Sequence, residues 1–460
     1  MATEALPITN PGVRVAVADR TTPLSYQELV RRLFPRLTGG IRWGLERTEA
    51  LLHQAGNPHL RYPTIHVGGT NGKGSVAATI ASVLSAAGHR TGLYSSPHLF
   101  SFRERVRIDG LPISEEDLVA AATPLWPAIE ESGASFFEAT TVIAFQALAE
   151  AEVDVAVIEV GLGGRLDSTN VISPELALIT NIAFDHAEYL GHTLEAIAGE
   201  KAGIIKPGVP LVTGETSPAV LSVLQHRAAL QQAPVTVVPA SDLTAPRLTG
   251  NQLRIDTRTW DELVVSSPLI GAHQAHNLRI AVTGLDLLAN QMSISAEAVV
   301  RGVHDVRWPG RFQLELLRGR HWVFDVAHNE AGVHALVETF GQLDLPRPVA
   351  LLVGILGDKD WRRMLPPLFG LADAITLTVP PTAPQTRAWD PRQVLAAVPD
   401  ARATVVDNFE NALKQAEAQA GAAGTILVTG SFHTVGDALA LLGLAETPPD
   451  FPLQHNDFSG

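Results

Sequence analysis

The 460-residue chain contains no cysteine. Disulfides and thiolate metal sites are therefore excluded, and any bound metal must use oxygen or imidazole ligands. No apolar run is long enough to cross a bilayer, and the first residues, MATEALPITN, lack the basic and apolar regions of a signal peptide. We therefore expect a cytoplasmic protein without a membrane partner.

Positive charge is also scarce. Lys and Arg together number 34 against 48 Asp and Glu, which gives a formal net charge of −14. This balance argues against a nucleic-acid partner, but not against a phosphate ligand, because charges beyond a Debye length of about 8 Å are screened. With 46% hydrophobic and 18% charged residues, the chain has the composition of a folded globular protein of two or three domains.

Two stretches alternate short β-branched runs with helix-period runs. The first runs from Thr64 to about Ala240, with strands such as TIHVGG and VDVAVIEVG, and the second starts at Phe312 with HWVFDVAH. Between them, NQLRIDTRTWDELVVSS is typical of a hairpin, and RWPGR at 307–311 predicts a hinge. We predict an α/β protein with a mostly parallel sheet in the larger N-terminal domain, 25–306, and a smaller α/β C-terminal domain, 307–445. We expect loose tails at 1–24 and 446–460.

The stretch HVGGTNGKGSVAATIASVL, 66–84, is a candidate phosphate-binding loop. Its glycines let backbone N–H groups approach phosphate, Lys73 supplies charge, and Ser75 supplies a hydroxyl. It also lies at the first strand-to-helix turn, where a helix dipole favours anions. A strict Walker pattern is not met, because Gly74 separates Lys73 from Ser75 and Val67 replaces the first glycine. A glycine-rich turn with a solvated lysine is the alternative.

The loop GTNGKGS resembles the nucleotide loop of the Mur ligase superfamily. Further blocks narrow the resemblance to the folylpolyglutamate synthase/dihydrofolate synthase family, and they follow the family's order over most of the chain. They are GLERTEALL, YSSPHLFSFRERVRIDG, FFEATTVIAF, IEVGLGGRLDSTNVI, TNIAFDHAEYLGHTLEAIAGEKAGIIKPG, GAHQAHNLRIAV, WPGRFQ, DVAHNEAG and TGSFHTVGD. The resemblance implies a P-loop-type ATP- and folate-binding N-terminal domain and a Rossmann-like C-terminal domain for glutamate ligation.

The reaction that the resemblance implies is ATP-dependent amide formation in folate metabolism. A carboxylate of the pterin substrate attacks the γ-phosphate to give an acyl phosphate and ADP, and the amine of L-glutamate then displaces phosphate. We expect ATP, one or two Mg²⁺ ions, L-glutamate and a folate or dihydropteroate as partners of a monomer. Whether both the dihydrofolate synthase and folylpolyglutamate synthase activities are present stays open.

The resemblance also implies ATP contacts. A guanidinium beside a hinge is suited to clamp phosphate as domains close, although a surface arginine at a linker is the alternative. The resemblance places Asn277 at the adenine base, Arg311 at the hinge and Asp325 in the C-terminal domain. The implied ATP-binding residues are Thr70, Asn71, Gly72, Lys73, Gly74, Ser75, Asn277, Arg311 and Asp325.

Glu159 ends a very apolar strand, so its carboxylate should emerge where open α/β sheets bind ligands. Capping of the following turn is the alternative. Imidazole is softer than the usual Mg²⁺ ligands, and a lysine on a helix flank is normally solvated. The resemblance nevertheless implies metal binding by Ser75, Ser96, Glu159, His186 and Lys201, the last as a carbamate.

The resemblance further implies catalytic roles for Lys73, Lys201 and His328. Phe136 and Phe137 could stack on a flat heterocycle, although aromatic residues that begin a helix are more often core. Ser431 is equally suited to a helix N-cap. The implied folate-binding residues are Phe136, Phe137, Thr140, Arg165, Leu166, Asp167 and Ser168, and the implied glutamate-binding residues are His328 and Ser431.

Two other functions fit parts of the sequence. A UDP-muramyl ligase would need a further domain ahead of the loop, but only 67 residues precede Gly68. A non-catalytic nucleotide- or folate-binding protein would explain the unusual loop spacing, but not why the complete set of implied charged and metal-binding residues is kept.

Overall fold

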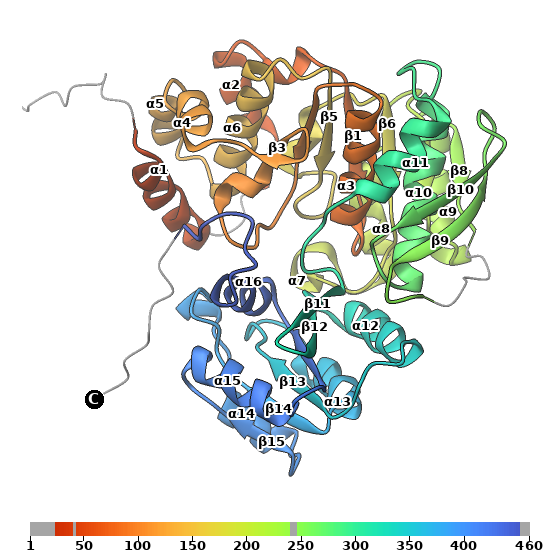
Figure 1. Cartoon of the computed structure of the whole chain (residues 1–460). Coiled ribbons are helices and arrows are strands. Elements are labelled where there is room, and N and C mark those ends of the chain that lie inside the picture. Colours follow the sequence, from red (N-terminus) through yellow and green to blue (C-terminus); the bar gives the residue numbers. More distant parts are fainter. Residues whose placement is uncertain (1–23, 40–42, 240–245, 451–460) are drawn as a thin grey trace, which may run out of the picture.

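A computed structural model describes residues 24–39, 43–239 and 246–450. Figure 1 shows two domains, with the larger N-terminal domain above the smaller one, joined by the chain between α11 and β11. In these ranges, no helix is long and apolar enough to span a bilayer.

The sheet of the first domain contains, in the described ranges, eight strands in the order β4-β3-β2-β5-β1-β6-β7-β8. All neighbours from β2 to β8 are parallel, which confirms the predicted mostly parallel sheet. The antiparallel edge made by β3 and β4 was not predicted, because these strands are very short and carry charge. The strands are β1 Thr64–Gly68, β2 Thr91–Tyr94, β3 Val106–Ile108, β4 Leu111–Pro112, β5 Val155–Glu159, β6 Leu176–Ile179, β7 Leu211–Thr213 and β8 Val235–Val237.

Helices cover both faces of this sheet. Val155 and Val157 of β5 share a core with α3, α10 and α11, whereas Ala156 and Ile158 point to the opposite core formed with α1, α2, α4, α5 and α6. This alternation follows from the two-residue period of a strand. The helices are α1 Tyr26–Leu33, α2 Glu46–Gln54, α3 Lys73–Ala86, α4 Glu115–Ala122, α5 Trp126–Ser132, α6 Phe136–Glu150, α7 Ala187–Leu190, α8 Leu194–Lys201, α9 Pro218–Leu230, α10 Ala272–Leu288 and α11 Ala296–Asp305.

The predicted hairpin is confirmed as β9, Asn251–Asp256, and β10, Glu262–Ser267. Every second residue of each strand is buried. The buried side chains join the core around α3 and α11, so the hairpin extends the first domain.

The second domain contains, among its described residues, a six-stranded sheet in the order β11-β12-β16-β13-β14-β15. Only β11 runs antiparallel to its neighbour. Helices α12 and α13 cover one face, and α15 and α16 cover the other. The elements are β11 Gln313–Leu317, β12 Arg320–Asp325, α12 Glu330–Gln342, β13 Val349–Val353, α13 Trp361–Leu371, β14 Ala374–Leu377, α14 Pro391–Ala397, β15 Ala403–Val405, α15 Phe409–Gln419, β16 Thr425–Thr429 and α16 Phe432–Leu441.

The chain returns to the first domain after α16. Asp450 accepts hydrogen bonds from the Tyr26 hydroxyl at 2.5 Å and from the Phe102 backbone N–H at 2.6 Å, and Glu446 pairs with Arg107 at 2.9 Å. The expectation of a loose tail from Glu446 is therefore wrong for 446–450. These residues satisfy partners that lie more than 300 positions away, which a search for local periodicity cannot detect. Residues 1–23 and 451–460 lie outside the described residues.

Candidate active site

The glycine-rich loop joins β1 to α3. Gly69 and Gly72 have φ values of 134° and 83°, and a Cβ at these positions would overlap Thr180 and Asn277 respectively. Glycine is therefore required for the close approach of these neighbours. The first turn of α3 has no side-chain cap and no acidic residue. Its N-terminal N–H groups are thus suited to an anionic ligand.

The departure from the Walker spacing has a structural reason at Gly74. A Cβ there would lie 2.8 Å from Nε1 of Trp308, which belongs to the segment between the domains. A serine or threonine directly after Lys73 would therefore displace the indole. The hydroxyl comes one residue later, where Oγ of Ser75 is buried and has no hydrogen-bond partner among the described residues.

Residues that follow β6 hold the loop in place. Asn71 N donates to Asn181 Oδ1 at 2.9 Å, and the Thr70 hydroxyl accepts from the Ala183 N–H at 3.0 Å. Nζ of Lys73 donates to the Thr70 carbonyl at 3.0 Å. These hydrogen bonds therefore fix the conformation of the loop and place the ammonium group of Lys73 at its edge.

Glu159 lies at the carboxyl end of β5, as predicted, and is 4% exposed. Its Oε2 accepts from the Ser96 backbone N–H at 3.1 Å. Burial raises the pKa of Glu159, and the charge of Lys73 is the largest influence that opposes the rise. The carboxylate is thus buried, accepts a backbone hydrogen bond and is influenced by the charge of Lys73.

Lys201 is buried, at 4% exposure, and its Nζ donates to the Gly69 carbonyl at 2.7 Å. Burial lowers the pKa of Lys201 to about 7, and the nearby charge of Lys73 lowers it further. A lysine on a helix flank is normally solvated, but Lys201 is buried because the end of α8 faces the glycine loop. Near neutral pH, a substantial fraction of this amine is uncharged.

His186 directly precedes α7 in a left-handed backbone conformation, with φ 51°. Burial lowers the pKa of His186 to about 4. The charge of Lys359 lowers it further, whereas the charge of Asp185 opposes the fall. The imidazole is therefore neutral at physiological pH, which leaves a lone pair for a ligand.

No group of three or more His, Cys, Asp or Glu residues within the described ranges forms a metal cluster. The donors nevertheless fit a hard cation that keeps several waters: the unpartnered hydroxyl of Ser75, the carboxylate of Glu159 and the neutral ring of His186. The charge of Lys73 opposes the rise in the pKa of Glu159 and adds to the fall in the pKa of His186.

The other expected ATP-binding residues reach this region from three elements. Asn277 of α10 abuts Gly72, and its Nδ2 donates to Gln274 at 3.1 Å. The Arg311 guanidinium lies 4.9 Å from the ring centroid of Phe432. Burial lowers the pKa of Arg311, and the charges of Asp325 and Glu159 oppose this.

Two expected site residues have structural partners. The carboxylate of Asp325 accepts the N–H groups of Phe312 and Ala327, both at 2.8 Å. Ser431 is 2% exposed and accepts the Thr434 N–H at 3.1 Å as the N-cap of α16. The N-cap interpretation of Ser431 therefore agrees with the structure.

The expected folate segments divide into buried and accessible side chains. Phe136 is 2% exposed and packs edge-on against Phe34 and Phe102, so it is core and does not offer a free face for stacking. Phe137 is half-buried, whereas the exposed Arg165 pairs with Glu200 at 2.9 Å. Leu166 is half-buried, and the remaining members, Thr140, Asp167 and Ser168, are buried and hydrogen-bonded within the fold.

Comparison with known proteins identifies the family. The Mur ligase middle domain matches residues 67–284, and the Mur ligase glutamate ligase domain matches 310–432. The chain is 35% identical over 428 residues to the dihydrofolate synthase/folylpolyglutamate synthase of Bacillus subtilis, covering 90% of this chain and 98% of that protein. The chain belongs to the dihydrofolate synthase/folylpolyglutamate synthase family of Mur ligases. It is a carbon–nitrogen ligase, as predicted.

Solved structures of this ligase family agree. Mycobacterium tuberculosis folylpolyglutamate synthase complexed with ADP matches with a TM-score of 0.84 and 33% identity, covering 92% of this chain and 99% of that chain. Escherichia coli FolC in complex with DHPP and ADP matches with a TM-score of 0.78 and 30% identity, covering 93% and 99%. The predicted two-domain α/β architecture is confirmed, and the muramyl-ligase alternative loses its support.

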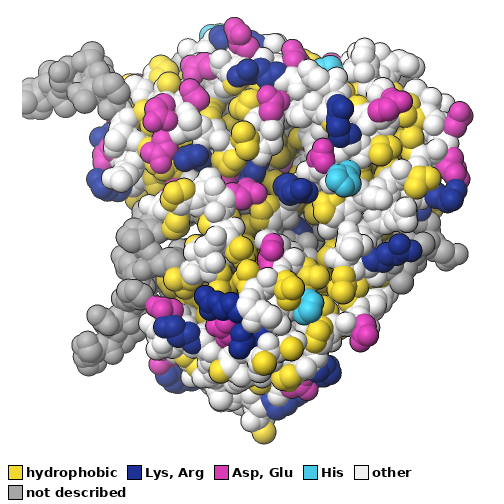
Figure 2. Space-filling view, viewed as in Figure 1, with side chains coloured by type: hydrophobic (Ala, Val, Ile, Leu, Met, Phe, Trp, Pro, Cys, Tyr) yellow, Lys and Arg dark blue, Asp and Glu magenta, His cyan; other side chains and the backbone are white. Residues whose placement is uncertain are grey.

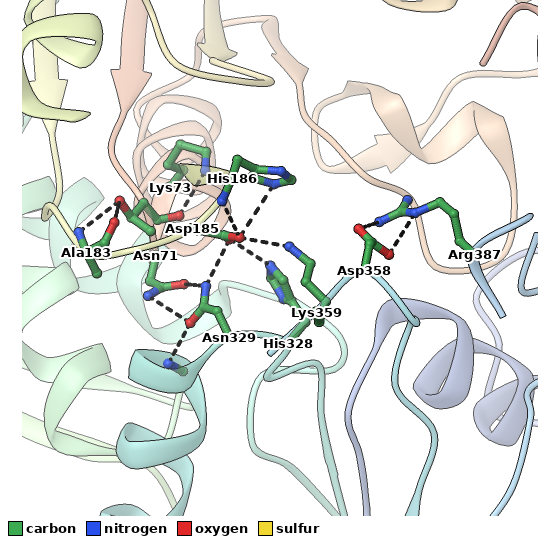
Figure 3. Close-up of polar contacts among 12 residues, drawn as sticks. Asn71, Lys73, Ala183, Asp185, His186, His328, Asn329, Asp358, Lys359 and Arg387 are labelled. Carbon is green, nitrogen blue, oxygen red and sulfur yellow. Dashed lines mark hydrogen bonds and ion pairs between the residues drawn. The ribbon is translucent and has the colours of Figure 1, made fainter. Parts of the chain in front are cut away.

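A polar cluster lies between the domains of this ligase, and it joins the expected residues Asn71 and His328 to Asp185, Asn329 and Lys359, which were not predicted (Figure 3). Asp185 of the first domain accepts from Nζ of Lys359 at 2.8 Å and from Nδ2 of Asn329 at 3.1 Å, and Nε2 of His328 lies 3.6 Å away. Asn329 also donates to Asn71 of the glycine loop at 2.9 Å. Each member follows the carboxyl end of a parallel strand, which is the signal that could have identified it.

This interdomain cluster is electrostatically tight. Burial alone would raise the pKa of Asp185, but the neighbouring His328 imidazole and the charge of Lys359 hold it well below its usual range. Asp185 is therefore ionised. The space-filling view shows a hollow between the two domains, with acidic and basic side chains around it (Figure 2).

Proposed function

We propose that the protein uses ATP to add L-glutamate to folates, and to dihydropteroate as well. The observation that carries this proposal is the convergence of the glycine loop with residues of the glutamate ligase domain on Asp185. It occurs in a chain that covers 98% of a bifunctional folate ligase. A cytoplasmic location and a monomeric state stay predictions of the sequence.

The first step is phosphoryl transfer. A carboxylate oxygen of the folate bonds to the γ-phosphorus of ATP while the bond from that phosphorus to the β–γ bridging oxygen breaks, and ADP leaves. Such a transfer needs positioning and charge neutralisation more than a protein nucleophile. Lys73 and the N-terminal N–H groups of α3 can supply both, with ATP held along 70–75.

Other residues would complete the ATP and metal sites. Mg²⁺, when bound, would neutralise phosphate charge, and its implied ligands are Ser75, Ser96, Glu159 and His186. Asn277, Arg311 and Asp325 would hold the nucleotide from α10, the interdomain segment and the second domain. For Asp325, contact with a nucleotide would add to the two backbone hydrogen bonds that its carboxylate already accepts.

The second step joins glutamate. Its amine nitrogen bonds to the acyl carbon, the carbon–oxygen bond to phosphate breaks, and the nitrogen releases a proton. His328 and Lys359 would bind this amino acid. Both side chains contact the Asp185 carboxylate and could contact a carboxylate of glutamate in the same way. Domain closure would exclude water, which otherwise hydrolyses the acyl phosphate. Ser431 would act indirectly, by fixing the start of α16.

Lys201 would carry a carbamate. Its neutral amine would bond to carbon dioxide and lose a proton, which turns a buried cation into an anionic oxygen donor for a second Mg²⁺. The pKa of about 7 supports this chemistry, because the neutral amine is the reactive form. A crystal structure with density that ends at Nζ of an ordered Lys201 would contradict it.

The folate would lie along the N-terminal end of α6 and the 161–171 segment. Phe137, Leu166 and Arg165 have accessible surface there and would contact the ligand. The buried members of the set, Phe136, Thr140, Asp167 and Ser168, would support that surface from below.

Purified protein tests the proposal through ADP release and amide formation. Turnover should require ATP, Mg²⁺, L-glutamate and either dihydropteroate or tetrahydrofolate, and radiolabelled glutamate should appear in the pterin product. Lys73→Ala should reduce turnover by about a thousandfold or more while the protein stays folded. Glutamate-independent ADP release without an amide product would overturn the proposal, and unchanged nucleotide and folate binding without turnover in the wild type would favour the non-catalytic alternative.

A further inference from the structure

One aromatic side chain lies between two residues that the proposed function assigns to different substrates. Phe432 is the first residue of α16 and is half-buried. The Cζ atom of Arg311, which would hold the nucleotide, lies 4.9 Å from the centroid of its ring. The ring centroid of His328, which would bind glutamate, lies 5.4 Å from the same point, with 53° between the two ring planes. Phe432 is therefore next to both sites without belonging to either of the implied residue sets.

The Arg311 side chain has few other partners. Its Nη1 donates to the Gly310 carbonyl at 3.3 Å and to the Pro309 carbonyl at 3.5 Å, which are long hydrogen bonds to its own segment. Among the described residues it forms no ion pair, and the carboxylate of Asp325 is engaged instead by two backbone N–H groups. The face of the Phe432 ring is thus the main side-chain contact that holds the guanidinium in place.

The Phe432 ring is itself carried on a firmly attached helix start. Ser431 Oγ accepts the Thr434 N–H at 3.1 Å, and Thr434 Oγ1 donates to the Gly354 carbonyl at 2.7 Å. Gly354 directly follows β13, so these bonds tie the first turn of α16 to the end of that strand. Phe432 also packs against the core that contains α15 and α16. Its ring therefore has a defined orientation toward Arg311.

The contact between Phe432 and Arg311 depends on the aromatic character of the ring, and not only on its size. A ring face attracts a guanidinium because the aromatic quadrupole is negative there. Such a contact changes a binding constant by about twofold to fivefold at an exposed site and by about thirtyfold when water is excluded. Leucine would fill part of the same space but has no quadrupole. The two side chains can therefore be distinguished by experiment.

We propose that Phe432 is a positioning residue of the ligase: its ring face orients the Arg311 guanidinium toward the nucleotide, and the same ring restricts the rotation of the His328 imidazole. The roles of Arg311 and His328 in this inference rest on the proposed function. Phe432 acts through these two residues and takes no part in the chemistry. The larger effect should fall on the nucleotide, because the His328 ring is also held by its Nδ1–H, which donates to the Val326 carbonyl at 2.9 Å.

The test measures the affinity for AMPPCP with Mg²⁺ by calorimetry, which needs no turnover. Phe432→Leu should weaken binding about fivefold or more, whereas Phe432→Tyr, which keeps the ring, should stay within about twofold of the wild type. Phe409→Leu is the matched control. Phe409 is likewise the first residue of a helix in the same core, and no guanidinium lies over its ring in the described part of the chain. This control should not change the affinity.

A double-mutant cycle then separates positioning from general support of the fold. In an Arg311→Met background, Phe432→Leu should change the AMPPCP affinity by less than about twofold, because the group on which the ring acts is gone. Equal weakening by Phe432→Leu in both backgrounds would show that the ring only supports the fold, and would overturn the assignment.

Fluorinated phenylalanines at position 432 provide a test that does not depend on the folding of Phe432→Leu. Fluorine atoms preserve most of the shape of the ring but withdraw electrons from its face. The affinity for AMPPCP should fall stepwise as fluorine atoms are added. An affinity that is independent of fluorination would overturn the cation–π assignment.

Steady-state kinetics test the contact with His328. In Phe432→Leu the KM for glutamate should rise about twofold to fourfold, and an unchanged value would overturn this half of the assignment. A wild type that binds AMPPCP but forms no amide would overturn the proposed function and leave the pairing of Phe432 with Arg311 intact. A wild type without affinity for AMPPCP would overturn both.

Discussion

Two of the contacts between the domains differ in chemistry. In the cleft, Asp185 meets Lys359 and His328, which are charged or polar side chains with partial exposure. At the C-terminal return, residues 446–450, the Asp450 carboxylate accepts hydrogen bonds from one backbone N–H and two hydroxyl groups. Nearby, Leu99 and Phe100 of the first domain pack into the core of the second domain. A ligand can replace the first kind of contact with its own charges. It cannot replace the second, so we expect the cleft to open and close while the return stays attached.

Breaking the cleft contact should have the largest effect on activity. Lys359→Met removes the cation that pairs with Asp185 and that would meet a carboxylate of glutamate. We expect kcat/KM for glutamate to fall about a hundredfold, since a charge-assisted contact contributes roughly 1.5–3 kcal/mol. Steady-state kinetics with each substrate varied would check this, and the KM for ATP should change little. An equal rise in both KM values would point to general damage.

The next prediction concerns the stability of the second domain, from which the C-terminal return extends, and its dependence on pH. Burial raises the pKa of Asp437, in α16, to about 7 from 3.8, although it accepts the Thr382 N–H at 3.0 Å. Between pH 4 and 7 the folded state keeps a proton that the unfolded state has lost, so stability falls as pH rises through this window.

Asp437→Asn removes this ionisation. Relative to the wild type, the variant should gain stability by a few kcal/mol between pH 4 and 7, as measured by urea denaturation at several pH values. Asp305→Asn, at an exposed carboxylate of α11, serves as the control and should follow the wild type. A wild-type stability that rises steadily over this window would contradict the assignment.

Cutting the return should lower stability more than activity. Asp450→Ala leaves the Phe102 N–H and the Tyr26 hydroxyl without their acceptor. We expect a loss of about 2 kcal/mol in the free energy of unfolding, with kcat within about twofold of the wild type. Thermal denaturation and turnover should be compared with Glu131→Ala, an exposed carboxylate at the end of α5. A large loss of kcat would show that the return takes part in domain closure.

The smallest effect is expected at the rim of the return. Glu446→Gln removes the ion pair with Arg107, whose acid side chain is 33% exposed. Arg107 is buried, at 7% side-chain exposure, but a glutamine side chain can still accept its hydrogen bond, so we expect a loss below about 1 kcal/mol that becomes smaller at high salt. A loss that persists in 1 M salt would mean that the geometry of the hydrogen bond matters more than its charge.

Local pattern predicted much of this fold. The apolar run that ends at Glu159 specified both a buried strand and a carboxylate at its end, and the glycine loop specified a strand-to-helix turn. Both depend on residues that are neighbours in sequence. The parallel direction of most strands then follows from the alternation of strands and helices, whereas their order in the sheet does not.

Other features depend on contacts between distant segments. The burial of Lys201 depends on the glycine loop 132 residues earlier, and the pairing of Asp185 with Lys359 joins two domains. Phe136 became core because Phe34 and Phe102 pack against it from other elements. Neither residue type nor spacing reports such encounters, so resemblance carried those parts of the site.

The contact between Gly74 and Trp308 links the loop sequence to the interdomain segment. A designer who wished to restore the common Walker spacing by moving the hydroxyl to position 74 would first have to shrink or relocate the indole. Loop and connector therefore constrain each other: a larger residue at position 74 would fit only with a smaller or displaced side chain at position 308.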